Sequence, residues 1–135
     1  MLDIEKLDHV GIRVSDKDAS LIFYKSLGFE MVQDIGFNEG HPILLRHALS
    51  GDVINLLGLA MPSAKNVLMD VPDKHAGITH ISYRVKSIEA AKKHLDSVAI
   101  PLSGEMTVDK FQAIFIRDPD RNVIEFDEYN ITQTL

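Results

Sequence analysis

The stretch ITHISYRV, residues 78–85, decides the fold. Its residues alternate between two faces, which is the period of a β-strand, and it is rich in β-branched and aromatic residues. Ile81 and Val85 belong to an apolar face suited to packing, while His80 and Arg84 belong to the opposite face. Because a histidine and an arginine are an unusual pair to place in a core, this second face is a candidate functional surface.

The same pattern occurs near the start of the chain, in LDHVGIRV, residues 7–14. Here His9 and Arg13 share one face of the expected strand, with the spacing of His80 and Arg84. The two histidines are 71 residues apart. This recurrence predicts that the chain contains an internal repeat, with two halves of similar structure.

A helix is expected after each of these two strands. In the first half Ser15 is the expected N-cap, Gly28 the expected end, and the apolar stripe is Ala19, Ile22, Phe23 and Leu27. In the second half Ser87 is the expected N-cap, and the stripe is Ile88, Ala91 and Leu95. Three further strands complete each half, at residues 29–35, 42–49 and 53–58 and at residues 100–106, 110–117 and 122–128.

Each half therefore has the order strand, helix, strand, strand, strand. The sequence predicts a single α+β domain over residues 1–135, with repeat one at residues 7–58, a linker at 59–76 and repeat two at 77–129. Each repeat supplies an incomplete sheet that the other can complete.

Composition excludes several classes of function. The chain of 135 residues is 45% hydrophobic, which suffices for a core, and it has no cysteine for a disulfide, a thiolate zinc site or a thiol nucleophile. A net charge of −6 without a basic cluster argues against nucleic acid as a partner. The apolar runs are too short to span a membrane, and the acidic start MLDIEKLD is unlike a signal peptide. We expect a cytoplasmic protein.

The last strands of the two halves also correspond. Residues 52–56, DVINL, align with residues 122–126, NVIEF, so that Asn55 corresponds to Glu125. Two histidines, His9 and His80, together with the Glu125 carboxylate, on facing strands, could hold a divalent metal ion. Ligands of this kind suit Fe(II), Mn, Ni, Co or Zn.

Three motifs, DHVGIRV at residues 8–14, FYKSLGF at 23–29 and DPDRNVIEF at 118–126, together with the repeat, resemble the vicinal oxygen chelate superfamily of glyoxalases, bleomycin resistance proteins and extradiol dioxygenases. The resemblance implies two βαβββ modules whose mixed sheets curve around a shared cavity, with helices outside, often in a homodimer. It also implies a small-molecule substrate.

The resemblance assigns roles to particular residues. It implies that His9, His80 and Glu125 are metal ligands and that Asn55 is a fourth ligand or a group just outside the ligand set. His9 and Arg13 have the spacing by which glyoxalase I follows its first ligand with an arginine for a carboxylate. Arg13 and Arg84 are therefore expected to bind a substrate carboxylate. The alternative for both arginines is a salt bridge on the sheet.

The reaction stays open among three hypotheses. The first is a glyoxalase-like lyase or isomerase that uses a divalent metal to stabilise an enolate-type intermediate. Asn55 departs from the glutamate of glyoxalase I, and an amide cannot act as a general base, so the base is not identified. The second is an Fe(II)-dependent extradiol-type dioxygenase, in which the extra histidine would be His47, although a structural role for His47 is the simpler interpretation. The third is a metal-free protein that binds a drug or another ligand.

Overall fold

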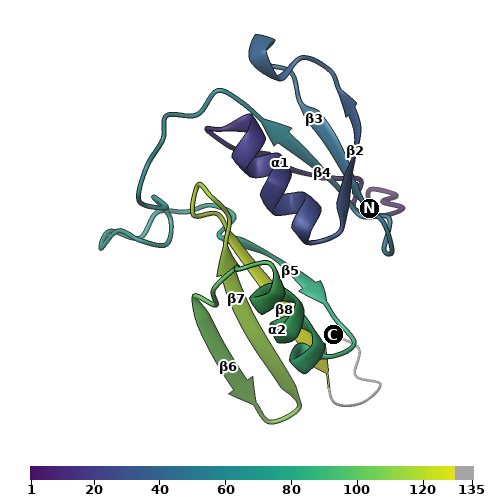
Figure 1. Ribbon diagram of the computed structural model, residues 1–135, viewed down its shortest axis with the longest axis vertical. Helices are drawn as coiled ribbons and strands as arrows, with labels where there is room; N and C mark the ends of the chain where they lie inside the picture. Colours follow the sequence, from purple (N-terminus) through teal and green to yellow (C-terminus); the bar gives the residue numbers. More distant parts are fainter. Residues whose placement is uncertain (130–135) are drawn as a thin grey trace. The chain divides into compact units, whose positions relative to one another are not determined.

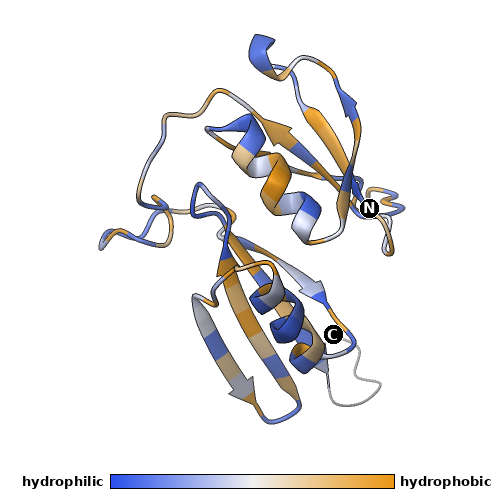
Figure 2. Cartoon of the chain, viewed as in Figure 1, coloured by the Kyte–Doolittle hydropathy of each residue, from blue (hydrophilic) through white to orange (hydrophobic). Residues whose placement is uncertain are grey.

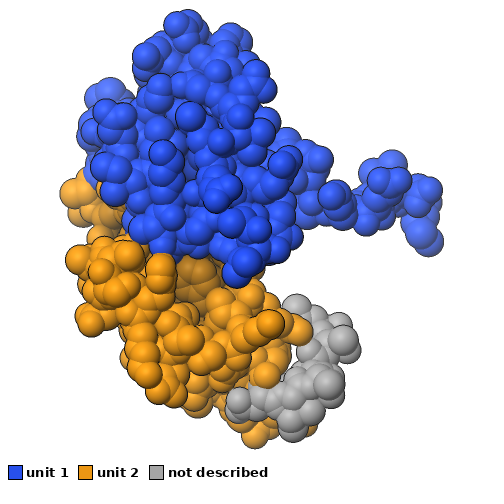
Figure 3. Space-filling view, turned by 45° about the vertical axis from the view of Figure 1, so that its right-hand side comes forward, with its two compact units in different colours: residues 1–63 blue, residues 64–135 orange. Residues whose placement is uncertain are grey.

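Both halves of the chain fold into the same order of elements (Figure 1), as seen in a computed structural model that describes residues 1–129. Residues 130–135 lie outside the described part. The chain divides into two compact units, unit 1 at residues 1–63 and unit 2 from residue 64 onward (Figure 3). Their elements confirm the α+β class and the two βαβββ modules.

Unit 1 contains β1 (Val10–Arg13), α1 (Lys17–Ser26), β2 (Phe29–Asp34), the short 3-10 helix η1 (Phe37–Glu39), β3 (Ile43–His47) and β4 (Val53–Leu57). Unit 2 contains β5 (His80–Arg84), α2 (Ile88–Ser97), β6 (Gly104–Val108), β7 (Phe111–Arg117) and β8 (Val123–Tyr129). The first strand of each unit is shorter than expected, and β6 begins at Gly104 rather than at Ile100.

The two sheets have the same mixed topology. Their strand orders are β1-β4-β3-β2 and β5-β8-β7-β6. The first and last strands of each unit pair in parallel, while the remaining neighbours are antiparallel. Parallel strands require a crossover connection, which the helix and the following hairpin supply here. In each unit the parallel pair, β1 with β4 or β5 with β8, thus places the first strand beside the last.

Each helix covers one face of its own sheet, and the core of each unit lies between its helix and its sheet. In unit 2, Ile88 and Leu95 of α2 are buried, as are Ile114, Ile116 and Ile124 of the sheet. The outer surface of α2 is mainly hydrophilic (Figure 2), and Glu89 pairs with Lys93 there at 3.4 Å. The polar residues that alternate with this core therefore belong to the other face of the sheet.

The N-terminal cap of α1 is one residue later than expected. Asp16, not Ser15, has the extended backbone of an N-cap, and its Oδ1 accepts a hydrogen bond from the Ala19 amide at 3.0 Å. The buried residues of α1 are Ser20, Phe23 and Tyr24. The inclusion of Ile22 was wrong, since Ile22 is 72% exposed. In α2, by contrast, Ser87 is the N-cap, as expected.

Gly28 ends α1 for a steric reason that also involves β3. Its φ is +100°, and a Cβ added there would lie 2.7 Å from Nε2 of His47. His47 Nε2 donates to the Leu27 carbonyl at 3.0 Å, while Nδ1 accepts from the amides of Leu49 and Ser50 at 3.2 Å each. These bonds define the tautomer and engage both ring nitrogens, which supports the structural interpretation of His47.

The segment expected to be a linker, residues 59–76, has no helix or strand, but within unit 2 an ion-pair cluster ties its Asp70 to Arg117 at the end of β7 and to Arg121. Asp70 accepts two hydrogen bonds from the Arg117 guanidinium, at 3.0 and 3.1 Å, and one from Arg121 at 2.9 Å. It also accepts from the Asn66 amide at 2.7 Å. The hydrogen bond from Arg121, followed by those from Asn66 and Arg117, holds the pKa of Asp70 well below its usual value of 3.8.

We expect the substitution Asp70→Asn to lower the Tm of the protein by roughly 5 °C at pH 7, because it removes the charge that two arginines share. A lowered carboxyl pKa contributes stability above the unfolded value of 3.8 and loses that contribution as the pH falls toward the folded pKa. The difference between the two proteins should therefore shrink below about pH 4. Thermal unfolding followed by circular dichroism checks this, with Asp73→Asn, an exposed neighbour, as control. Equal effects of the two substitutions would contradict a stabilising cluster.

Candidate metal centre

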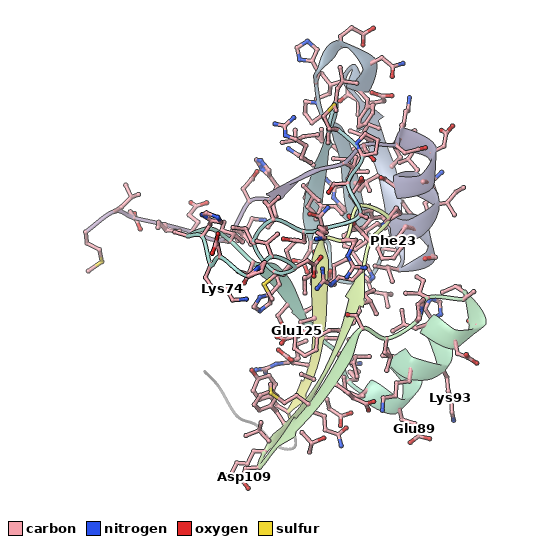
Figure 4. All side chains as sticks on the ribbon, turned by 90° about the vertical axis from the view of Figure 1, so that its left-hand side faces the viewer. Phe23, Lys74, Glu89, Lys93, Asp109 and Glu125 are labelled. Atoms are coloured by element: carbon pink, nitrogen blue, oxygen red, sulfur yellow. The ribbon has the colours of Figure 1, made fainter. Side chains whose placement is uncertain are left out.

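The parallel pair of β5 and β8 brings His80 and Glu125 together. Their strands run in register with His80 opposite Val123 and Ser82 opposite Glu125. His80 Nε2 lies 4.0 Å from Glu125 Oε2, and the two side chains are 40% and 14% exposed. Glu125 projects from β8 on the side of the sheet away from α2 (Figure 4). The face predicted from the alternation of residues 78–85 is thus the face that carries both groups.

Unit 1 places His9 and Asn55 at the equivalent positions. Gly11 is opposite Asn55 in the parallel pair of β1 and β4, as Ser82 is opposite Glu125. His9 immediately precedes β1, is exposed, and has its Nδ1 2.7 Å from Asp8 Oδ2. The side-chain oxygen of Asn55 is buried and has no hydrogen-bond partner among the described residues.

These two pairs define what each unit can offer a metal ion. Among residues 1–129, no group of three or more His, Asp and Glu side chains gathers in a way that could hold a metal. Unit 2 brings His80 and Glu125 within 4.0 Å of each other, and the strand register gives His9 and Asn55 the equivalent positions in unit 1. We call the pair in unit 1 half-site 1 and the pair in unit 2 half-site 2.

The geometry of half-site 2 fits a divalent ion. Nitrogen and oxygen ligands lie about 2.1 Å from such an ion, so two ligands of one ion are at most about 4.2 Å apart. The 4.0 Å between His80 Nε2 and Glu125 Oε2 is within this limit, and tetrahedral geometry at about 3.4 Å requires a small side-chain movement. In half-site 1, the buried Asn55 oxygen without a donor is an acceptor that a cation could satisfy.

The electrostatics of half-site 2 also favour a cation. Burial is the largest cause that raises the pKa of Glu125 above its usual 4.5, and the charge of nearby Asp127 raises it further. The Ser82 hydroxyl and His80 act in the opposite direction. Burial and a neighbouring acid both destabilise the ionised form of a carboxylate, and a bound cation would stabilise that form.

Ser82 and Asp127 were missed as site residues, although the sequence contained a signal for both. They share the alternating face of His80 and Glu125. Asp127 is 8% exposed, and the Ser82 hydroxyl donates to its Oδ2 at 2.5 Å. A buried acid on a strand beside a candidate ligand is a second acidic group of the site.

The two arginines expected to bind substrate have contacts within their own units. Arg13 donates from Nη1 to the Gly58 carbonyl. The Arg84 guanidinium lies over the ring of Tyr129, with its carbon 4.0 Å from the ring centroid, and Tyr129 stacks on Phe111. A role in substrate binding stays a prediction for both.

The relatives of the chain agree with this arrangement of modules. Residues 6–126 match the model of the glyoxalase/bleomycin resistance protein/dioxygenase superfamily. A glyoxalase domain-containing protein, RDO1, from Mycosarcoma maydis is 30% identical over an alignment of 134 residues that covers 95% of this chain and 70% of the relative. The chain belongs to the glyoxalase/bleomycin resistance protein/dioxygenase superfamily.

Solved structures of similar fold include proteins with different roles. A glyoxalase family protein from Enterococcus faecalis matches 94% of this chain and 100% of its own, with a TM-score of 0.75 and 23% identity. A lactoylglutathione lyase from Agrobacterium tumefaciens matches 98% and 100%, with a TM-score of 0.71 and 18% identity. An antibiotic-binding protein from a Streptomyces species matches 96% and 99%, with a TM-score of 0.70 and 18% identity. At these identities the likeness shows the fold alone. None of the helices in the described part of the chain is long and apolar enough to cross a membrane.

We expect Glu125→Gln to raise the Tm of the metal-free protein by roughly 2–5 °C at pH 7. A raised carboxyl pKa means that stability is lost as the pH rises from the unfolded value of 4.5 through the folded pKa, and an uncharged glutamine avoids this loss. The gain should disappear below about pH 4.5, where the glutamate of both folded and unfolded chains is protonated.

Thermal unfolding in the presence of a chelator measures the effect. Glu89→Gln, on the exposed face of α2, is the control and should change the Tm little. A Glu125→Gln variant that is less stable than the parent at pH 7 would contradict the electrostatic reading of half-site 2.

Proposed function

We propose that the protein is a metal-dependent enzyme that acts on a small oxygen-rich molecule, most simply a glyoxalase-like lyase or isomerase. The observation that carries the proposal is the pair His80 and Glu125, whose nitrogen and oxygen lie 4.0 Å apart on one face of neighbouring strands. If this pair had only a structural role, a histidine at the corresponding position of unit 1 would not be needed. His9 occupies that position, which supports a role in metal binding.

The proposed ligands are His9, His80 and Glu125, with Asn55 as a fourth ligand or a group beside the site. Neutral imidazole and carboxylate are ligands that Fe, Mn, Ni, Co and Zn all accept, so the ligand types do not select among these metals. A bound divalent ion would polarise a substrate oxygen and stabilise the negative charge that develops on it.

The chain's own residues would bind and orient the substrate. Arg84 lies on the face of the sheet that carries Glu125. A guanidinium suits a substrate carboxylate, so Arg84 and Arg13 are proposed to hold one. Asn55 has no titratable group, so it would orient a ligand or a water rather than move a proton.

A second function, an Fe(II)-dependent dioxygenase, is favoured by the ligand set itself. His9, His80 and Glu125 form a two-histidine, one-carboxylate set, the set of non-haem Fe(II) oxygenases. His47 is a weak candidate for the additional acid or base, since both its ring nitrogens are already engaged. Consumption of oxygen by the iron-loaded protein in the presence of substrate would distinguish this reaction from a lyase or isomerase.

A third function, ligand binding without metal, is supported by the antibiotic-binding protein among the similar folds. It predicts that the protein binds a small molecule equally well in the presence of a chelator. The expected homodimer and the cytoplasmic location stay predictions.

The metal content of the purified protein tests the proposed function. We expect about one divalent ion per chain by plasma mass spectrometry, and we expect His80→Ala and Glu125→Ala each to lose it, because two ligands of the set then become one at half-site 2. His75→Ala, an exposed histidine outside the half-sites, is the control and should keep the ion.

The protein is purified without a histidine tag, so that the ion is not bound by the tag, and is then incubated with each candidate metal. Failure to bind any of them would contradict both enzyme proposals and leave the ligand-binding function. Retention of the ion by His80→Ala would contradict the proposed ligand set.

A further inference from the structure

Asp127 is a buried acid with incomplete hydrogen bonding. It lies on β8 two residues after Glu125 and on the same face. Its Oδ2 accepts from the Ser82 hydroxyl at 2.5 Å, whereas its Oδ1 is buried and has no hydrogen-bond partner among the described residues. A buried carboxylate oxygen without a donor destabilises the fold, so its presence calls for a reason.

Unit 1 shows that the fold does not need an acid at this position. By register, Leu57 in β4 corresponds to Asp127, and Gly11 in β1 corresponds to Ser82. A Cβ added at Gly11 would lie 3.3 Å from Cδ1 of Leu57, so the first unit fills the same place with close apolar packing. The same pair of strands is therefore built once with a glycine and a leucine and once with a serine and an aspartate.

The Ser82–Asp127 pair lies directly beside half-site 2. Ser82 stands opposite Glu125 in the parallel strand pair, and Asp127 follows Glu125 by two residues on the same face of β8. One hydroxyl has one hydrogen to donate, and Asp127 Oδ2 receives it. Two carboxyl groups, those of Glu125 and Asp127, thus lie near one hydroxyl donor. Their negative charges repel each other in the empty protein and attract a cation.

We propose that Asp127, held by Ser82, is a positioning residue that strengthens cation binding at His80 and Glu125 at the expense of stability in the empty protein. The inference rests on the proposed metal centre. The negative charge of Asp127 adds to the attraction for a divalent ion, and the Ser82 hydroxyl fixes the carboxylate beside Glu125. Residues that support metal ligands in this way typically change metal affinity about 10–100-fold when they are replaced.

The substitution Asp127→Asn tests the proposal, because it keeps the shape and an acceptor for Ser82 while it removes the charge. We expect the affinity for Zn²⁺ and Mn²⁺, measured by competition with a chromogenic chelator, to fall about tenfold or more. We also expect the Tm of the chelator-treated protein to rise by a few degrees. A merely structural role predicts the reverse, a lower Tm with an unchanged affinity.

Three further variants sharpen the test. Ser82→Ala should weaken binding, and its effect should not add to that of Asp127→Asn, since the two residues act through one contact. Ser82→Thr keeps the hydroxyl and should retain the affinity. Glu105→Gln removes one negative charge from the same sheet, on the side of α2 where Lys92 pairs with Glu105, and should leave the affinity unchanged.

The outcomes separate the proposal from the function on which it rests. Wild-type protein that binds neither Zn²⁺ nor Mn²⁺ would overturn the metal centre and this inference together. Wild-type protein that binds an ion, with an Asp127→Asn variant that binds it within about twofold as tightly, would overturn only the role of Asp127. An equal loss of affinity in Glu105→Gln would show a general charge effect and would also overturn it.

Discussion

Parallel pairing between the first and last strands of each unit is the constraint on which the candidate centre depends. It places His80 and Glu125, which are 45 residues apart in the chain, on one face with their polar atoms 4.0 Å apart. A sheet in which β5 paired antiparallel with a sequence neighbour would separate them. The helix and the hairpin between β5 and β8 supply the crossover that this pairing requires, and the helix α2 also covers the opposite face of the sheet. The apolar packing of one face thus leaves the other for polar chemistry.

The repeat of this arrangement allows the two units to differ where the fold permits. Equivalent positions hold Asn55 and Glu125, Gly11 and Ser82, and Leu57 and Asp127. Unit 1 has neutral or apolar residues at all three positions, whereas unit 2 has two acids and a hydroxyl. Because each unit forms a sheet of the same topology, the backbone tolerates either set of residues. The acidic set in unit 2 then has its simplest explanation in what it binds.

Local patterns in the sequence are sufficient to predict the fold and half of the candidate centre. Alternation over residues 78–85 identifies the face of His80, and the internal repeat identifies Glu125 as the partner of Asn55. The helix caps follow from short-range chemistry too, although Asp16 and Ser15 are both good N-caps and only the backbone conformation distinguishes them.

Contacts between distant residues are what the sequence could not reveal. Asp70 meets Arg117 and Arg121 across 47 and 51 residues, and Ser82 meets Asp127 across 45. No period or motif connects such pairs, since they depend on the loops that bring the strands together. The engagement of both His47 nitrogens likewise depends on the end of α1 and the turn after β3, which are close only in the folded unit.

The most direct test of the metal centre is the position of the ion itself. Crystals of the protein loaded with Zn²⁺ or Mn²⁺ would locate the ion by its anomalous scattering. The metal hypothesis predicts one strong peak about 2.0–2.3 Å from His80 Nε2 and from a Glu125 carboxylate oxygen. An ion bound elsewhere, or one that touches Glu125 without His80, would contradict it.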